Sequence, residues 1–174
     1  PTGSDAGSAP ATEGALQTVD AGKLTIATGE PAFSPWVEND DPASCQGFEA
    51  AVSCAVAEKL GFTKDDIVWV RSNFDSAIAP GPKDWDMNVQ QFSITDQRKQ
   101  AVDFSSPYYT TTQAIVTTGT SPAASATTVA ELKNIPVGVM SATTSYQVAK
   151  DQLGTGNLSV FNSNDDAVAA LQSG

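Results

Sequence analysis

Residues 90–109 constrain the fold more tightly than any other part of this 174-residue chain. They read QQFSITDQRKQAVDFSSPYY and begin at the end of a short run, residues 87–90, that we predict to be a strand. Ser93 and Asp96 then have the spacing of a helix-capping pair, in which a hydroxyl residue is followed three positions later by an acid. We therefore expect a strand that leads directly into a helix, with Arg98 in its first turn.

Arg98 is the first candidate for a binding residue. A guanidinium near the free N–H groups of a helix start suits a carboxylate, because it can donate two parallel hydrogen bonds and the helix dipole adds support. The hydroxyl residues Ser93 and Thr95 are its neighbours in sequence. The alternative is that Arg98 pairs with Asp96 or Asp103 on a solvated surface, where such pairs are common and weak. The residues alone leave both interpretations open.

The composition is that of a folded and acidic chain. Apolar residues make up 40% of it, which is enough for a core, and 20 acidic against 9 basic residues give a net charge of −11. This charge argues against binding to nucleic acid or to anionic lipid. The chain contains no histidine, the commonest general base and metal ligand. We expect no catalytic residue, no metal site and no cofactor.

The two cysteines, Cys45 and Cys54, allow one intrachain pairing. A disulfide between them would tie the loop before the first helix to that helix. The alternative is a pair of reduced thiols with Cys54 half-buried. Export from the cell would favour the disulfide, because disulfides persist in oxidising compartments.

The hydrophobic pattern and the turn residues predict a series of strands and helices. Residues 1–22 consist mostly of Gly, Ser, Ala, Pro, Thr and acids, so we expect a disordered tether there. The expected strands are residues 24–28, 67–70, 87–90, 114–118, 137–140 and 158–161. The expected helices are residues 48–60, a segment that opens at residues 142–145 and ends before Gly154, and residues 164–171.

The loop of residues 29–36 carries two large aromatic side chains, Phe33 and Trp36. Aromatic groups on a loop after a strand suit a ligand, since ligands of open α/β sheets bind beyond the carboxyl ends of the strands. Alternatively, such a side chain fills the core, which we expect of Trp36 more than of Phe33.

FSITDQRKQAVDFSSPYY resembles the signature of bacterial family 3 extracellular solute-binding proteins, the amino-acid receptors of ABC importers. The resemblance is to an actinobacterial-like and truncated member. Further pieces of the chain agree with the family in order: FSPW, GFEAAVSCAVAEKLGF, VRSNFDSAIAP, LKNIPVGVMSATTS and NDDAVAALQSG.

The resemblance implies an α/β fold of periplasmic-binding-protein type, with two α/β lobes joined by a hinge. Lobe 1 would be residues 23–117 and lobe 2 would be residues 118–174, with lobe 2 incomplete in this chain. An incomplete lobe could be completed by, or swapped with, another chain. The family also implies an extracytoplasmic protein with an ABC-transporter permease as partner, and lipid anchoring through a residue outside this sequence.

The resemblance also implies which residues bind an amino acid or a similar small carboxylate. Arg98 and Thr144 would hold the carboxylate, with a hydrogen bond from Ser93, while two phenylalanines would flank the body of the ligand. Two glutamines stand where many relatives have small residues, and they could narrow the pocket or read a polar side chain of the ligand. The ligand-binding set is Phe33, Phe74, Gln90, Gln91, Ser93, Arg98 and Thr144.

Two other functions compete with this interpretation. One is a sensor or interaction domain of a larger receptor. The other is a small dehydratase-like enzyme on the same scaffold, which would need a positioned acid or base. The candidates for that role are Glu30, Asp75 and Asp86, and no pair of them has a telling spacing.

Overall fold

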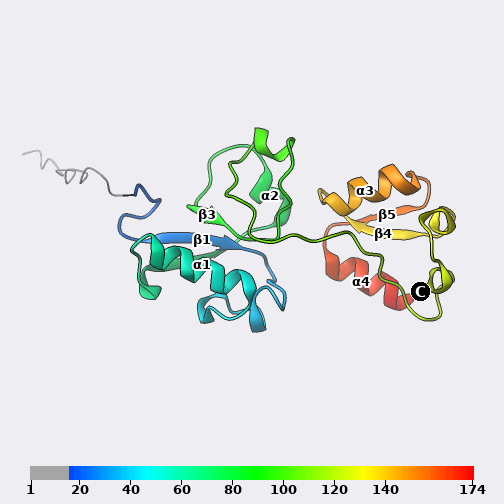
Figure 1. Cartoon of the computed structure of the whole chain (residues 1–174), viewed down its shortest axis with the longest axis horizontal. Helices are drawn as coiled ribbons and strands as arrows, with labels where there is room; N and C mark the ends of the chain where they lie inside the picture. Colours follow the sequence, from blue (N-terminus) through cyan, green and yellow to red (C-terminus); the bar gives the residue numbers. More distant parts are fainter. Residues whose placement is uncertain (1–15) are drawn as a thin grey trace, which may run out of the picture. The chain divides into compact units, whose positions relative to one another are not determined.

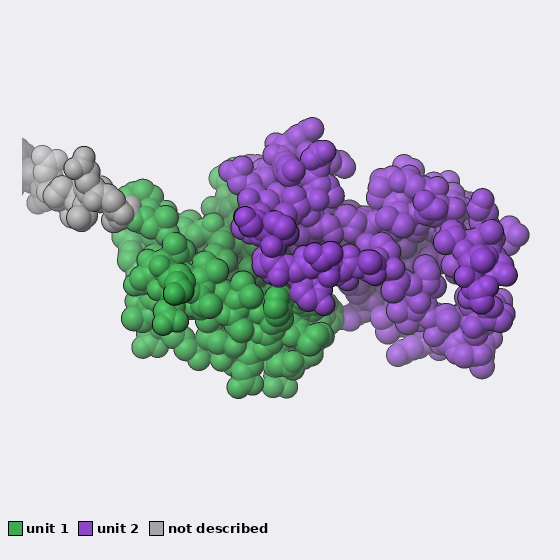
Figure 2. Space-filling view, in the orientation of Figure 1, with its two compact units in different colours: residues 1–73, 82–91 green, residues 74–81, 92–174 purple. Residues whose placement is uncertain are grey.

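The computed structural model describes residues 16–174. The tether predicted over residues 1–22 therefore lies mostly outside the described residues. The backbone divides into two units (Figure 2), one made of the described part of residues 1–73 with residues 82–91, and one of residues 74–81 with residues 92–174. The lobe boundary predicted at residue 117 stays a prediction.

Unit 1 is built on a three-stranded parallel sheet with β1 (Leu24–Thr28) at its centre. On one side β1 pairs with β2 (Ile67–Arg71), and on the other with the short strand β3 (Met87–Asn88). In this register Ile26 lies opposite Trp69 and Met87. All five residues of β1 are buried, as expected of a central strand that is covered on both faces.

The helix α1 (Phe48–Lys59) supplies the rest of the core of unit 1 and lies beside β1 in Figure 1. It ends next to Gly61, whose φ of +90° is a conformation that suits glycine. One buried core cluster consists of Leu24, Ile26, Ala57 and Val89, with Phe62, Ile67, Trp69 and Met87 packed against it, and a second consists of Ala32, Val37 and Ala50.

Backbone carbonyls, rather than a side chain, cap the start of α1. The carbonyl oxygen of Trp36 accepts hydrogen bonds from the N–H groups of Glu49 at 2.9 Å and Ala50 at 3.3 Å, and that of Pro35 accepts one from Phe48 at 2.9 Å. These bonds satisfy N–H groups that have no partner inside the helix. The loop with Phe33 and Trp36 is thereby fixed to the start of α1.

Three short 3-10 helices complete unit 1: η1 (Glu38–Asp40), η2 (Pro42–Ser44) and η3 (Lys64–Asp66). A disulfide joins Cys45, directly after η2, to Cys54 in α1. The disulfide expected from an exported protein is thus present, and both cysteines are engaged in it.

Unit 2 contains a pair of parallel strands, β4 (Val137–Met140) and β5 (Leu158–Phe161). The helices α3 (Thr144–Leu153) and α4 (Asn164–Ser173) lie on opposite sides of this pair in Figure 1. Hydroxyl groups cap both helices, because Thr143 accepts from Tyr146 N and Ser163 accepts from Asp166 N. The remaining helices are α2 (Phe74–Ile78), η4 (Arg98–Gln100), η5 (Pro122–Ser125) and η6 (Val129–Leu132).

Two sequence-based expectations are wrong. Residues 114–118 form no strand in the structure. The helix expected from Ser93 is reduced to the single turn η4, where the Thr95 hydroxyl accepts a hydrogen bond from Arg98 N at 3.2 Å. The strands expected at residues 137–140 and 158–161 are confirmed with the same bounds.

Within residues 16–174, no helix is both long enough and apolar enough to cross a membrane.

Candidate functional site

Arg98 lies at the centre of a compact cluster in unit 2. Arg98 is only 8% exposed to solvent, which is unusual for an arginine. The short helix η4 begins at Arg98, and the Thr95 hydroxyl fixes the backbone there. Burial lowers the pKa of the Arg98 guanidinium, which nevertheless remains a cation because arginine is not deprotonated in proteins.

The Arg98 guanidinium is held by two backbone carbonyls and two phenyl rings. Nη1 donates to Ser93 O at 2.8 Å and Nη2 donates to Ala142 O at 2.9 Å. Its central carbon lies 5.4 Å from the ring centre of Phe74 and 5.6 Å from that of Phe92. A guanidinium has five N–H groups, so these two bonds leave three donors that bond to no other described residue.

Ser93, whose backbone carbonyl binds Arg98, also carries a hydroxyl group. Ser93 Oγ and Thr144 Oγ1 are 3.4 Å apart, and Gln113 Nε2 donates to Thr144 Oγ1 at 3.3 Å. The other end of the Gln113 amide accepts from Ser145 Oγ at 2.7 Å. The cluster thus offers a cation and several hydroxyl and amide groups, which together suit an anionic oxygen ligand.

The surface-pair interpretation of Arg98 does not hold in this structure. Asp96 pairs with Lys99 at 3.2 Å, and among the described residues Arg98 takes part in no ion pair. The cation is held by neutral carbonyls, so its charge is not neutralised by a side chain of the described chain.

Ala142 has an unusual backbone conformation for its residue type. Its φ is +55°, in the left-handed region where glycine is favoured. The backbone therefore has a glycine-like conformation at Ala142 although a methyl group is present. The Ala142 carbonyl, which Arg98 binds, belongs to this strained peptide segment.

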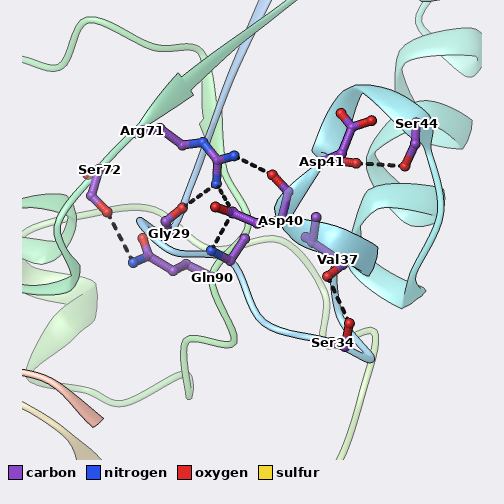
Figure 3. A network of polar contacts seen from close by, with 10 residues as sticks. Gly29, Ser34, Val37, Asp40, Asp41, Ser44, Arg71, Ser72 and Gln90 are labelled. Carbon is purple, nitrogen blue, oxygen red and sulfur yellow. Dashed lines mark hydrogen bonds and ion pairs between the residues drawn. The ribbon is translucent and has the colours of Figure 1, made fainter. Parts of the chain in front are cut away.

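A second group of polar contacts lies at the carboxyl edge of the sheet in unit 1 (Figure 3). Gly29 follows β1, Ser72 follows β2 and Gln90 lies two residues after β3, so the parallel strands bring them to the same edge. Gln90 is 8% exposed, and its Nε2 donates to Ser72 O at 3.2 Å. This edge is where open α/β sheets bind their ligands.

The loop that carries Phe33 is fastened to β2 by Arg71 (Figure 3). Arg71 Nη1 donates to Gly29 O at 2.8 Å and to Asp40 Oδ1 at 2.6 Å, and its Nη2 donates to Asp40 O at 2.7 Å. Asp40 Oδ1 also accepts from Ala32 N at 2.8 Å. The Ala32 amide, and after it the Arg71 guanidinium, hold the pKa of the Asp40 carboxyl below its ordinary value. Phe33 itself is 41% exposed.

Gln91 is held by a buried acidic residue. Its φ is +51°, its backbone N–H donates to Glu49 Oε1 at 2.9 Å, and its side-chain Nε2 donates to Glu49 Oε2. Glu49 is 0% exposed and lies in the first turn of α1. Hydrogen bonds of this kind offset the cost of burying its polar oxygens.

The structure divides the seven predicted ligand-binding residues between the units. Phe74, Ser93, Arg98 and Thr144 come together in the unit 2 cluster, through the ring contact of Arg98 and the bonds of Ser93. Phe33, Gln90 and Gln91 belong to unit 1. Their common role in one ligand site stays a prediction.

Sequence reasoning missed several contributors: Phe92, Gln113, Glu49 and the pair Asp40–Arg71. Only Phe92 carried a signal, because it lies inside the constraining stretch between two predicted site residues. The others act through contacts between distant parts of the chain, which the spacing of residues does not reveal.

The three acids considered for an enzyme each have different surroundings. Asp86 accepts from Val19 N and from Thr25 N, each at 2.7 Å, so both of its oxygens are engaged by backbone. Asp75 accepts from Ser141 Oγ at 3.4 Å in unit 2, while Glu30 is exposed in unit 1.

The chain belongs to the bacterial extracellular solute-binding proteins, family 3, whose model matches residues 24–173. A probable histidine-binding protein of Campylobacter jejuni is 38% identical over 89 residues, which are 49% of this chain and 33% of that protein. The L-arginine-binding protein of Pseudomonas aeruginosa is 28% identical over 148 residues, which are 83% of this chain and 55% of that protein.

Solved structures give the same result for the fold. The ancestral amino acid-binding protein AncCDT-1, described as a precursor of cyclohexadienyl dehydratase, matches with a TM-score of 0.72 and 27% identity, over 87% of this chain and 67% of that one. The arginine-, lysine-, histidine-binding protein ArtJ of Geobacillus stearothermophilus matches with a TM-score of 0.72 and 28% identity, over 87% and 63%. The predicted α/β fold of periplasmic-binding-protein type is confirmed.

This chain spans between a third and just over half of the length of these two curated relatives from Campylobacter and Pseudomonas.

Proposed function

We propose that the complete protein is an extracytoplasmic receptor that binds an amino acid, or a similar small carboxylate, for import by an ABC transporter. The observation that carries this proposal is the buried Arg98 guanidinium, whose charge no described side chain neutralises. A carboxylate ligand would supply the missing negative charge. Membership of the solute-binding family and the amino-acid-binding names of the relatives support the same conclusion.

In this proposal the Arg98 cluster holds the ligand carboxylate. The three remaining N–H groups of Arg98 and the hydroxyls of Ser93 and Thr144 would donate to its oxygens. Phe33 and Phe74 would flank the body of the ligand, and Gln90 and Gln91 would line its far end. A ligand that contacts both lobes favours the closed state by its extra contacts, and the permease would recognise that state.

The Ala142 carbonyl competes with a ligand carboxylate for hydrogen bonds from Arg98. In this structure the Ala142 carbonyl takes one of the N–H groups that could serve a carboxylate. A carboxylate accepts more strongly from a guanidinium than a neutral carbonyl does, because the bond is between opposite charges. A bound carboxylate would therefore displace the Ala142 carbonyl from the Arg98 N–H group or share that N–H group with it. The Arg98 side chain would keep its position.

Titration calorimetry of the full-length protein with a panel of amino acids tests the proposal. Replacement Arg98→Ala should weaken every ligand that binds by about a hundredfold or more, since it removes a charge-assisted bond to the carboxylate. Lys99→Ala is the matched control, because Lys99 is the next residue along and pairs with Asp96 at the surface. Unchanged affinity in Arg98→Ala, or equal losses in both variants, would contradict the assignment.

A further inference from the structure

The Gln90 side chain holds one polar atom that no described residue satisfies. The residue is 8% exposed, and its Nε2 donates to the Ser72 carbonyl at 3.2 Å. Its Oε1 is buried and accepts no hydrogen bond from any described part of the chain. Buried acceptors without a donor are rare because they lose their bonds to water, so each calls for an explanation.

The contacts of Gln90 decide which end of its amide is left over. The Ser72 carbonyl can only accept, so the NH₂ end must face it and the oxygen must point elsewhere. Gly29 packs closely against the same side chain, since a Cβ built on Gly29 would stand 3.2 Å from Gln90 Nε2 and 3.5 Å from its Cγ. The amide is therefore held in one orientation that presents an acceptor (Figure 3).

The place of this acceptor in the fold is the edge at which a ligand is expected. Gly29, Ser72 and Gln90 all lie just beyond the carboxyl ends of the three parallel strands of unit 1. Parallel α/β sheets bind ligands at this edge. The hydroxyls of Thr25 and Thr28 and both amide atoms of Asn88 are also buried without a described partner, but these residues lie within β1 and β3. Gln90 lies beyond the end of β3, at the edge where a ligand group could reach it.

We propose that Gln90 Oε1 selects the ligand by accepting a hydrogen bond from an N–H group of the ligand's side chain. The inference rests on the proposed function and names the class of ligand: an amino acid that ends in an ammonium, guanidinium, imidazole or carboxamide group. A hydrocarbon end leaves the oxygen unsatisfied, and a carboxylate end is repelled by it. Since the oxygen is covered in this structure, the ligand reaches it once the covering residues have moved.

Paired ligands test the selection on the full-length protein. Titration calorimetry would compare L-lysine, L-arginine and L-glutamine, which carry a side-chain N–H donor, with L-norleucine, L-methionine and L-glutamate, which do not. We expect the tightest donor ligand to bind at least about tenfold more tightly than any ligand without a donor, because a site built around a buried acceptor rejects analogues that leave it unpaired. Equal or tighter binding of norleucine or glutamate overturns the inference.

Two variants show whether Gln90 is the cause of the preference. Gln90→Met keeps the length of the side chain but removes the acceptor, and should reduce the preference to within about twofold by weakening the donor ligands. Gly29→Ala keeps the amide but crowds it, and should reduce the same preference in part. A preference that both folded variants retain in full overturns the inference.

The outcomes separate this inference from the proposed function. Arg98→Lys should weaken all ligands by a similar factor and leave the preference unchanged, because it acts on the carboxylate that all amino acids share. If ligands bind and depend on Arg98 but show no donor preference, the proposed function stands and the role of Gln90 is wrong. If no amino acid binds to the wild-type protein, both are wrong.

Discussion

Several single residues occupy conformations that other residue types would adopt more easily, and Ala142 is the clearest case. Its methyl group is carried at φ +55°, next to the carbonyl that Arg98 binds. Left-handed backbone costs an ordinary residue about 1–2 kcal/mol, while glycine adopts it freely. Ala142 therefore carries a backbone strain energy that glycine would remove.

We predict that Ala142→Gly stabilises the protein. The relief of strain should exceed the extra entropy that glycine gives the unfolded chain, for a net gain of about 0.5–1 kcal/mol in the free energy of unfolding by urea. Ala149→Gly is the opposite control, because Ala149 is a buried residue in the interior of α3, where glycine costs about 1 kcal/mol. Loss of stability in Ala142→Gly would show that the strain is absent in solution.

The residues around Ala142 also show what the sequence could and could not reveal about the site. Arg98, Ser93 and Thr144 were identified from local patterns and from the family resemblance, and the structure places them together. The carbonyl of Ala142 and the carboxyl group of Glu49 were not foreseen, because each reaches its partner across more than 40 residues of chain. Local spacing carries no information about which distant backbone groups will meet.

Helices and strands were predictable where the local pattern and the packing agree. The strands β4 and β5 have the expected bounds, and each has the other as a partner. Residues 114–118 have a similar composition but no strand pairs with them in the described chain, and an extended segment without a ladder is not a strand. The helix expected from Ser93 stops after one turn, since residues 97–100 are all polar and give no apolar face to pack.

The junction between the aromatic loop and α1 gives a prediction about one element. Gly47 has φ +98°, and a Cβ there would stand 2.5 Å from the Trp36 carbonyl oxygen that caps the helix. Gly47→Ala should therefore destabilise the protein by about 2 kcal/mol or more, through backbone strain together with the loss of the cap.

Gly61→Ala is the matched control at the other end of α1. Its φ is +90°, but a Cβ there would have no neighbour within 4 Å. It should cost only the backbone strain, about 1 kcal/mol. Urea unfolding of both variants measures the difference, and equal losses would mean that the contact with Trp36 is unimportant.

For the chain as a whole, acidic groups dominate the charge, and several of them are stabilised as carboxylates in the folded state. The Lys23 ammonium, 2.8 Å away, and then the Thr63 hydroxyl lower the pKa of Asp66 to about 2. The Ala32 amide lowers the pKa of Asp40, and the Thr127 amide lowers that of Glu131. All three shifts have the same sign, so they add in their effect on acid stability.

We predict that stability falls as the pH falls from about 4 to about 2. A carboxyl group whose folded pKa lies below its unfolded value stabilises the fold above the unfolded pKa, and this contribution is lost as the pH falls through the folded pKa. Urea unfolding at a series of pH values measures the decline. Asp66→Asn and Lys23→Met should each make it shallower, and a decline that neither variant changes would argue against the pair.

Asp86 has a practical consequence for measurements on this protein. Its two oxygens bind the backbone of Val19 and Thr25, so the polypeptide enters the sheet at the amino end of β1. Gly29, Ser72 and Gln90 lie beyond the opposite ends of the strands. A dye, a biotin group or a sensor chip attached at residue 16 would therefore join unit 1 on the side away from that edge, which makes this the preferred point of attachment for a biosensor.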